Sequence, residues 1–212
     1  MKKVYFIRHG ESEGNRLKIH QNQATPLTEI GLSQAKIVAL RFTKIQASLI
    51  ISSPCLRAQQ TAQAIAEKNN LYISTNDLFT EKRGPSELVG LAHESQQSRA
   101  VRSEITLHFF DQNGHWQYSD EETAYEFAQR IKQGLDFLSQ RPEENLLVVS
   151  HSLVLHMIFA TILSQNCNQK LIDLYSIYEN FRINNTSVSV AIYDEENRKW
   201  IVDCLNDYSH LS

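Results

Sequence analysis

The chain has 212 residues, with 21 lysines and arginines against 24 aspartates and glutamates and a formal net charge of −3 at pH 7. This near balance gives no broad basic field, so it argues against nucleic acid or an anionic membrane as a partner and leaves room only for local anion sites. The length is sufficient for one hydrophobic core, and we expect residues 1–212 to form a single domain.

The cysteines and the apolar runs indicate the cellular compartment. Cys55, Cys167 and Cys204 are widely spaced and odd in number, which suits neither a disulfide framework nor a zinc ribbon. The basic start MKK is followed by only four apolar residues, whereas a secretory signal needs about 7–15. No run approaches the ~18 apolar residues of a membrane span. We therefore expect a soluble, cytoplasmic protein.

Short apolar runs alternate with stretches of helical periodicity along most of the chain. This alternation predicts an α/β fold with a largely parallel sheet. The last two runs flank the polar segment DEENRK and should pair as a hairpin. The predicted strands are Val4–Ile7, Ser48–Ser52, Leu71–Ser74, Leu146–Ser150, Ser187–Tyr193 and Trp200–Leu205.

Three helices follow from the same pattern. Apolar residues over Leu32–Phe42 share one helical face, and Thr28 is a suitable N-cap for that helix. A second apolar face covers Ala124–Leu138, in a helix that should end near Gln140 because a proline follows. A third helix should begin at Ser53-Pro54, with the serine as N-cap and the proline in the first helical position.

The segment from Lys82 to Tyr118 has weaker periodicity and mixes aromatic with charged residues. We interpret it as a partly helical insertion that lies over the sheet's edge as a lid or small subdomain. Its cations could meet a second acidic group of a ligand and its aromatic rings could stack on a ring, although such side chains are usually solvated or packed on the parent domain. The candidates are Lys82, Arg83, Arg99, Arg102, His108, Trp116 and Tyr118.

Cationic and ionisable residues follow three of the predicted strands. Arg8 and His9 come directly after the first strand. Arg57 stands in the first turn of the helix after the second strand, and His151 follows the strand that ends at Ser150. Because ligands bind outside the carboxyl ends of parallel strands, these four side chains should converge on one crevice. Each alone could be an ordinary structural or solvated residue, but their recurrence favours a site.

The four side chains favour phosphate as the ligand. Arginine offers a planar fork that matches phosphate or carboxylate oxygens, and N–H groups at helix starts favour the same anions. Arg57 would lie against the positive end of a helix dipole, which suggests an anion that both of them bind. Zinc held by His9, His151 and a carboxylate is the alternative by residue type. Two arginines in the same crevice would repel the metal, so we set zinc aside.

Several motifs resemble those of a known family. YFIRHGESEGN, PLTEIGLSQA, SSPCLRAQQTAQAIA and VVSHS are similar to the successive signatures of the histidine phosphatase superfamily, also called the phosphoglycerate mutase-like family. The end of the chain, from RINNTSVSVAIYD to NDYSHL, resembles the family's closing hairpin. These segments cover nearly the whole chain outside the insertion. The resemblance implies a three-layer α/β sandwich with a mostly parallel central sheet flanked by helices.

The resemblance also implies roles for the residues at the strand ends. His9 would be the nucleophile that attacks phosphorus and becomes a phosphohistidine, which splits one transfer into two easier ones. A backbone carbonyl beside Gly10 could bind its other ring nitrogen and fix the tautomer. Donors around the phosphoryl oxygens would stabilise the charge of the transition state. By resemblance, these donors are Arg8, Arg57, His151 if it is protonated, and the neutral Asn15.

A carboxyl group should protonate the leaving oxygen and later activate water. Family members usually place this glutamate after the third strand, in a stretch like LFTEKRG, which assigns the role to Glu81. Glu87 is the alternative because the spacing to Gly90 differs from the family pattern by about one residue, and Glu81 could instead be a solvated surface charge. Ser152 replaces the family's usual glycine, and its hydroxyl could bind a phosphate oxygen or cap the following helix.

Three functions stay open. The first is a metal-independent phosphomonoesterase for a small phosphorylated metabolite, in which water resolves the phosphohistidine. The second is a phosphoglycerate-type mutase, for which an insertion of ~37 residues is short, although loop length discriminates weakly. The third is a non-enzymatic module that binds a phospholigand or phosphoprotein, against which an intact His9 argues. The resemblance implies no cofactor, and the expected partner is a small phosphate ester or free phosphate; oligomeric state stays open.

Overall fold

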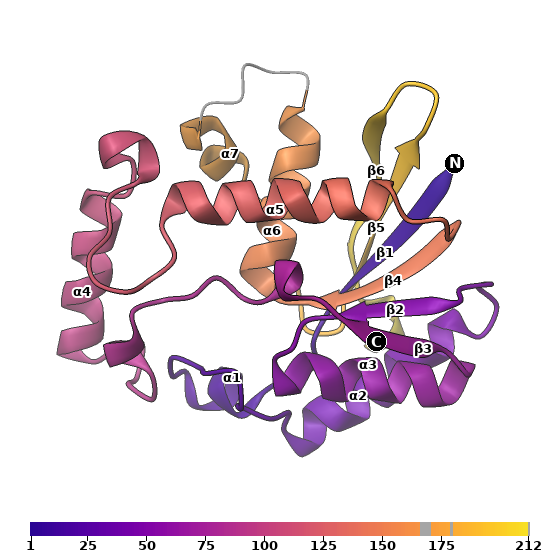
Figure 1. Ribbon diagram of the computed structural model, residues 1–212. Helices are drawn as coiled ribbons and strands as arrows, with labels where there is room; N and C mark the ends of the chain where they lie inside the picture. Colours follow the sequence, from indigo (N-terminus) through magenta and orange to yellow (C-terminus); the bar gives the residue numbers. More distant parts are fainter. Residues whose placement is uncertain (166–170, 179, 212) are drawn as a thin grey trace.

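The computed structural model describes residues 1–165, 171–178 and 180–211. A six-stranded sheet with the strand order β3-β2-β4-β1-β5-β6 forms the central layer (Figure 1). Strands β1 to β4 run parallel to one another. Strand β5 pairs antiparallel with β1, and β6 pairs antiparallel with β5. The strands are β1 (Lys2–Arg8), β2 (Leu49–Ser52), β3 (Tyr72–Thr75), β4 (Asn145–Ser150), β5 (Val188–Asp194) and β6 (Lys199–Asp207). The predicted α/β class and mostly parallel sheet are confirmed.

All six predicted strands are present, each with its ends within two residues of the prediction, and β5 and β6 form the predicted hairpin. The register of the sheet aligns the ends of the strands that carry the candidate site. Arg8 in β1 lies opposite Ser150 in β4, and Ser52 in β2 lies opposite Val149 in β4. The residues that follow β1, β2 and β4 therefore emerge at the same edge of the sheet.

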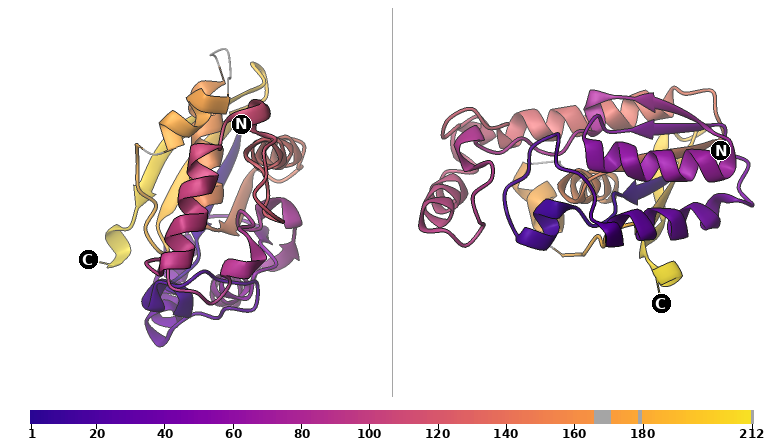
Figure 2. Two further views of the ribbon diagram at one scale, coloured as in Figure 1. Left: turned by 90° about the vertical axis from the view of Figure 1, so that its left-hand side faces the viewer. Right: turned by 90° about the horizontal axis from the view of Figure 1, so that it is seen from below.

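Helices cover both faces of the sheet, which gives the three layers (Figures 1 and 2). Residues of β1 alternate between the two cores because successive strand side chains point to opposite faces. Phe6 packs edge-on against Phe159, with ring centroids 5.5 Å apart, whereas the neighbouring Ile7 belongs to the core on the other face. The helices of the first core are α5 (Ala124–Ser139) and α6 (Ser152–Ser164), and those of the second are α2 (Glu29–Ala39) and α3 (Leu56–Asn69).

Two of the three predicted helix starts or ends are confirmed and one is wrong. Thr28 caps α2, its hydroxyl accepting a hydrogen bond from the Gly31 N–H at 3.0 Å, and α5 ends at the predicted position. The helix predicted to begin at Ser53-Pro54 begins instead at Leu56, with Cys55 as N-cap. The Ser53 hydroxyl does not cap the helix because it lies in a turn before it, where it contacts His151.

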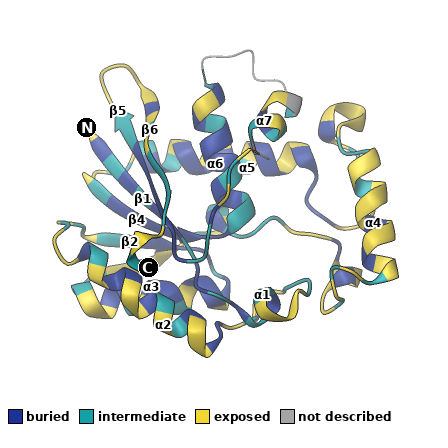
Figure 3. Ribbon diagram, turned by 180° about the vertical axis from the view of Figure 1, so that it is seen from behind, coloured by how far each residue is buried: buried dark blue, intermediate teal, exposed yellow. Residues whose placement is uncertain are grey.

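The segment 82–118 contains one α-helix, α4 (Gln96–Leu107), and short 3-10 helices at Ser86–Leu88 and Asp111–Gly114. Helix α4 stands apart from the sheet, beyond one end of α5, and most of its surface is exposed (Figures 1 and 3). An antiparallel bridge between Ile19 and Ala92 joins this segment to the loop that follows α1 (Glu13–Leu17).

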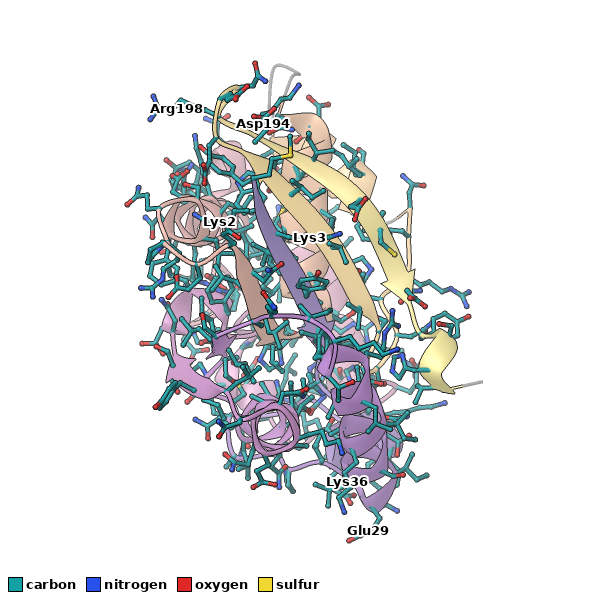
Figure 4. The ribbon with its side chains drawn as sticks, turned by 90° about the vertical axis from the view of Figure 1, so that its right-hand side faces the viewer. Lys2, Lys3, Glu29, Lys36, Asp194 and Arg198 are labelled. Carbon is teal, nitrogen blue, oxygen red and sulfur yellow. The ribbon has the colours of Figure 1, made fainter. Side chains whose placement is uncertain are left out.

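At the opposite end of the sheet, where β1 begins, two lysines make structural contacts. Lys2 and Lys3 point to opposite sides of β1 (Figure 4). The Lys2 ammonium donates to the Ser139 carbonyl at the end of α5, and Lys3 pairs with Asp203 in β6 at 3.0 Å. This edge is thus fixed by structural contacts, at a distance from the carboxyl ends of the strands.

Two further findings concern the helices and the cysteines. No helix in the described part of the chain is long and apolar enough to cross a membrane. The thiols of Cys55 and Cys204 are free, while Cys167 lies outside the described residues.

Helix α7 (Leu171–Tyr178) lies beside α6.

Candidate active site

The loop after β1 is fixed by a close backbone approach. A Cβ atom added to Gly10 would lie 2.5 Å from the Gly31 carbonyl oxygen, and one added to Gly31 would lie 2.0 Å from the Glu11 carbonyl oxygen. Only glycine at both positions lets this loop rest directly on the first turn of α2. The Gly10 N–H donates to the Thr61 hydroxyl of α3 at 3.1 Å. The residues before Gly10 are therefore held rigidly between two helices.

The structure brings His9 and His151 together at the ends of adjacent strands. The His9 N–H donates to the Ser150 carbonyl at 3.0 Å, and the two imidazole ring centroids are 5.1 Å apart. Both side chains are buried. Arg8 and Arg57 lie close enough for their charges to lower the pKa of both histidines. The four residues that sequence analysis placed at one crevice thus form one group, which we call the strand-end cluster.

The hydrogen bonding of His9 leaves one ring nitrogen for chemistry. Nδ1 lies 2.6 Å from the Gly10 carbonyl oxygen, and a carbonyl can only accept, so Nδ1 carries the proton and Nε2 carries the lone pair. Burial, followed by the charges of Arg8 and Arg57, lowers the pKa of His9 well below its ordinary value. At neutral pH the imidazole is therefore uncharged, with Nε2 as a potential nucleophile.

Three nitrogen atoms of the strand-end cluster are buried and have no hydrogen-bond partner in the described part of the chain. They are Arg8 Nε, Arg57 Nε and His151 Nδ1. The arginines are anchored elsewhere on their guanidinium groups, Arg8 to the Ile183 carbonyl at 2.6 Å and Arg57 to the Asn22 carbonyl at 2.9 Å. A buried donor that lacks a partner costs about 1–3 kcal/mol. Phosphate oxygens, which only accept, would satisfy such donors.

His151 is the N-cap residue of α6 and is fully buried. Its Nε2 lies 2.7 Å from the Ser53 hydroxyl. Burial, followed by the charges of His9 and Arg57, lowers its pKa well below the ordinary value. The donor role that the resemblance implies for His151 was conditional on protonation, and this environment favours the neutral side chain.

Glu81 lies beside the strand-end cluster, whereas Glu87 does not. Burial raises the pKa of Glu81, and the nearby charge of Arg57 and the Lys82 N–H, 3.0 Å from Oε1, oppose this rise. Glu87 is exposed, and its charge acts on Tyr118. A carboxyl with a raised pKa beside two arginines suits proton transfer. Of the two candidates from the sequence, Glu81 is the one near the arginines, and its role as the proton donor stays a prediction.

Asn15 and Ser152, both predicted to bind substrate, lie at the start of helices near the strand-end cluster. Asn15 Oδ1 accepts hydrogen bonds from the Ser12 N–H at 3.2 Å and from Asn185 Nδ2 at 3.3 Å. Its NH₂ group is the part that could donate to a ligand. Ser152 does not cap α6, because it is the first helical residue, and its hydroxyl lies 3.4 Å from His156 Nδ1. A contact from either residue to phosphate stays a prediction.

Lys82 and Arg83 are tied to the chain that follows the insertion. Lys82 Nζ donates to the Glu122 carbonyl and Arg83 Nε donates to the Asp120 carbonyl, both at 2.9 Å. Arg83 also lines an open depression of about 680 Å³ beside α5, together with Gln129. None of the cluster residues lines this depression. The contacts of Lys82 and Arg83 give them a structural role, and a role in substrate binding stays a prediction.

Three residues at the site escaped the sequence analysis. Ser53 binds His151, Asn185 donates through Nδ2 to the His9 carbonyl at 3.0 Å, and Thr61 accepts from Gly10. Ser53 directly follows β2, so the rule about strand ends that found Arg8 and His9 could have found it as well. No comparable signal marks Asn185 or Thr61.

The geometry can be compared with known proteins. A sequence model of the histidine phosphatase superfamily (branch 1) matches residues 4–207. The chain belongs to this superfamily. Its residues outside that match are few, so the superfamily assignment covers the fold and the whole strand-end cluster.

Similar proteins include two curated relatives, both named probable phosphoglycerate mutase GpmB. The one from Proteus mirabilis is 29% identical over 218 residues, covering 100% of this chain and 96% of the relative. The one from Yersinia pestis is 30% identical over 220 residues, covering 100% and 95%.

Solved structures share the fold at lower identity. A putative alpha-ribazole-5'-P phosphatase from Escherichia coli matches with a TM-score of 0.80 at 22% identity, covering 97% of this chain and 96% of that one. A mycobacterial glucosyl-3-phosphoglycerate phosphatase matches with a TM-score of 0.77 at 22% identity, covering 97% and 99%. YhfR of Bacillus stearothermophilus matches over the full length of both chains, with a TM-score of 0.79 at 23% identity.

Proposed function

We propose that this protein is a metal-independent phosphomonoesterase that works through a phosphohistidine on His9. The observation that carries the proposal is the state of His9, a neutral imidazole whose Nδ1 is bound to Gly10 and whose Nε2 is left with a lone pair. Arg8 and Arg57, each with a buried Nε that has no partner among the described residues, lie beside it. A nucleophile surrounded by hydrogen-bond donors that can bind phosphate oxygens supports phosphoryl transfer.

In the first step, Nε2 of His9 attacks phosphorus and the bond from phosphorus to the leaving oxygen breaks. The protonated carboxyl of Glu81 gives its proton to that oxygen, so the alcohol leaves neutral. Arg8 and Arg57 stabilise the charge on the equatorial phosphoryl oxygens. The phosphate dianion favours a charged imidazole, so its arrival would raise the pKa of His151 and let that residue donate as well.

In the second step, water attacks the phosphohistidine. The Glu81 carboxylate takes the proton from water, the phosphorus–nitrogen bond breaks, and His9 returns to its neutral tautomer. Inorganic phosphate leaves and Glu81 is protonated again, ready for another cycle. One carboxyl thus serves both steps, which requires a pKa near the working pH, and burial raises the pKa of Glu81 in that direction.

The substrate we propose is a small phosphorylated metabolite in the cytoplasm. The names of the structural neighbours, alpha-ribazole-5'-P phosphatase and glucosyl-3-phosphoglycerate phosphatase, support a phosphate ester of this size. The free thiols of Cys55 and Cys204 fit a reducing compartment. Asn15 and Ser152 would contact the phosphate, and Lys82 and Arg83 the remainder of the substrate. The near balance of charge fits a partner other than nucleic acid or a membrane.

A phosphoglycerate mutase is the second candidate, because the curated relatives carry that name. A mutase would use the same first step and then return the phosphoryl group from His9 to a bound sugar acid instead of to water. The strand-end cluster serves both reactions, so the two differ only in what accepts the phosphoryl group. Product analysis separates them.

The test is phosphate release from 4-nitrophenyl phosphate at pH 5–7 with EDTA present. We expect release by the wild type and a loss of at least about 10⁴-fold in kcat for His9→Ala, with the same far-UV circular dichroism. Retained activity in His9→Ala, or loss of wild-type activity in EDTA and its return with zinc, would overturn the proposal. Conversion of 3-phosphoglycerate to its isomer without phosphate release would establish the mutase instead.

A further inference from the structure

The guanidinium group of Arg130, in α5, donates hydrogen bonds through each of its nitrogen atoms to two other parts of the chain. Nε and Nη2 donate to the two carboxylate oxygens of Glu122, at 2.7 and 2.8 Å. Nη1 donates to the carbonyl oxygens of Leu78 and Thr80, both at 2.8 Å. The second of these carbonyls belongs to the residue immediately before Glu81. Arg130 therefore joins Glu122 to the segment that carries the proposed acid.

Other bonds complete this attachment. The Ser150 hydroxyl, at the end of β4, donates to the Phe79 carbonyl at 2.7 Å, so each carbonyl over Leu78–Thr80 has a partner. On the far side of Glu81, the Glu122 N–H donates to the Arg83 carbonyl at 2.9 Å, and Lys82 donates to the Glu122 carbonyl. The backbone is thus bound on both sides of Glu81.

The ion pair between Arg130 and Glu122 is more sheltered than an ordinary surface pair. The side chains are 18% and 11% exposed, and the pairing is bidentate, the geometry that gives arginine–carboxylate bonds their strength and direction. The charge of Arg130 is also felt at His151, where it helps to lower the pKa. The charge of Arg130 therefore contributes to the electrostatics of the strand-end cluster.

We propose that Arg130 and Glu122 are positioning residues that hold the Glu81 carboxyl at the leaving oxygen. This inference rests on the proposed phosphatase function. It concerns how the proposed acid, Glu81, is held in place, which the residues of the strand-end cluster do not explain. A general acid must lie within hydrogen-bond reach of the atom it protonates, and a displacement of about 1 Å can cost about 10²-fold in rate. Loosening the Arg130 bonds should therefore weaken proton transfer and leave attack by His9 intact.

The experiment compares two esters of similar shape whose leaving groups differ in basicity. Phenolate is a stronger base than 4-nitrophenolate, so its departure depends much more on protonation by a general acid. Phenyl phosphate therefore reports on Glu81, and 4-nitrophenyl phosphate reports on His9 and the arginines. The measured quantity is kcat/KM, since it reports the first transfer and not the hydrolysis of the intermediate. For Arg130→Gln we expect a loss of about 10–100-fold with phenyl phosphate and under about threefold with 4-nitrophenyl phosphate.

Arg141→Gln is the matched control. Arg141 makes a similar two-point ion pair with Glu143 just before β4, at the opposite edge of the sheet from the cluster. This substitution should change kcat/KM little, and by the same factor for both esters. Its main effect should be a lower melting temperature. Equal losses for the two esters in Arg130→Gln would overturn the positioning role, since they would show general damage to the site.

Two more variants keep the test decisive. In Glu81→Gln, adding Arg130→Gln should cause no further loss with phenyl phosphate, because Arg130 acts through the missing acid; losses that add would overturn the proposal. If Arg130→Gln does not fold, Glu122→Gln keeps the volume and the carbonyl contacts of Arg130, and should show a selective loss of about 3–10-fold. An inactive wild type would instead contradict the proposed function itself.

Discussion

The strand-end cluster and the insertion at residues 82–118 contain the same types of side chain in opposite circumstances. In the cluster, His9 is 2% exposed and Arg57 is 3% exposed, and the nitrogens Arg8 Nε and Arg57 Nε have no partner among the described residues. In the insertion, the side chain of Arg99 is 64% exposed and pairs with Glu94 at 3.7 Å. His108 lies 2.7 Å from Asp111.

The difference separates a ligand site from an ordinary charged surface. Water satisfies an exposed arginine, and a surface ion pair contributes only about 0.2–1 kcal/mol. A buried arginine whose Nε lacks a partner is costly unless something else binds there. The polar residues that we propose for catalysis are therefore those that the fold buries and leaves partly unbonded at the ends of β1, β2 and β4.

The largest effect that tests this comparison comes from two glutamates, Glu81 beside the cluster and Glu87 in the insertion. We expect Glu81→Gln to lower kcat/KM for phenyl phosphate by about 10²–10³-fold, since the leaving oxygen loses its proton donor. With 4-nitrophenyl phosphate the same variant should show a burst of nitrophenolate followed by slow turnover, because the phosphohistidine lacks its base. Stopped-flow absorbance measures both phases.

Glu87→Gln is the matched variant for this experiment. It makes the same substitution at an exposed residue of the 3-10 helix Ser86–Leu88 and should change kcat/KM by less than about twofold. A larger loss in Glu87→Gln than in Glu81→Gln would reverse the assignment of the acid. It would also mean that exposure does not distinguish the two regions.

The same contrast explains how far the sequence predicted the structure. The strands and the members of the cluster were predictable because strand ends and the residues after them are local features of the sequence. Helix α3 begins later than predicted, and the Ser53 hydroxyl is instead bound to His151, 98 positions away. Asn185 reaches the His9 carbonyl across 176 positions, and Arg130 reaches Leu78 across 52. Bonds over such separations leave no local pattern to detect.

The second prediction concerns stability and pH. The pKa values of His9 and His151 lie well below 6.5 in the folded protein, so below pH ~6.5 the unfolded chain binds more protons and the free energy of unfolding falls. The limiting slope for the pair is about 2.7 kcal/mol per pH unit. Glu81, with its raised pKa, contributes in the opposite sense above pH ~4.5 and offsets part of this slope. Urea unfolding at pH 7, 6 and 5 measures the net effect.

The double variant His9→Asn/His151→Asn provides the comparison for this slope. Asparagine does not titrate, so the free energy of unfolding of the variant should vary less between pH 7 and 5 than that of the wild type. An unchanged slope would mean that the two buried histidines do not dominate the pH dependence. In that case the unusual environment of the cluster would have no measurable consequence for folding.

The smallest expected effect belongs to the insertion. Arg102 is exposed, and its side chain makes a long hydrogen bond of 3.4 Å from Nη1 to the His93 carbonyl, so its charge is available to a ligand with a second acidic group. Arg102→Ala should raise KM for 3-phosphoglycerate by about 2–5-fold, the effect of an exposed ion pair, with little change in kcat. The increase should shrink at 0.5 M salt because exposed charges are screened. With phenyl phosphate, which lacks the second acid, KM should not rise. A fall in kcat for both substrates would instead place Arg102 at the reacting phosphate, and no change with either would make the insertion's cations a solvated surface.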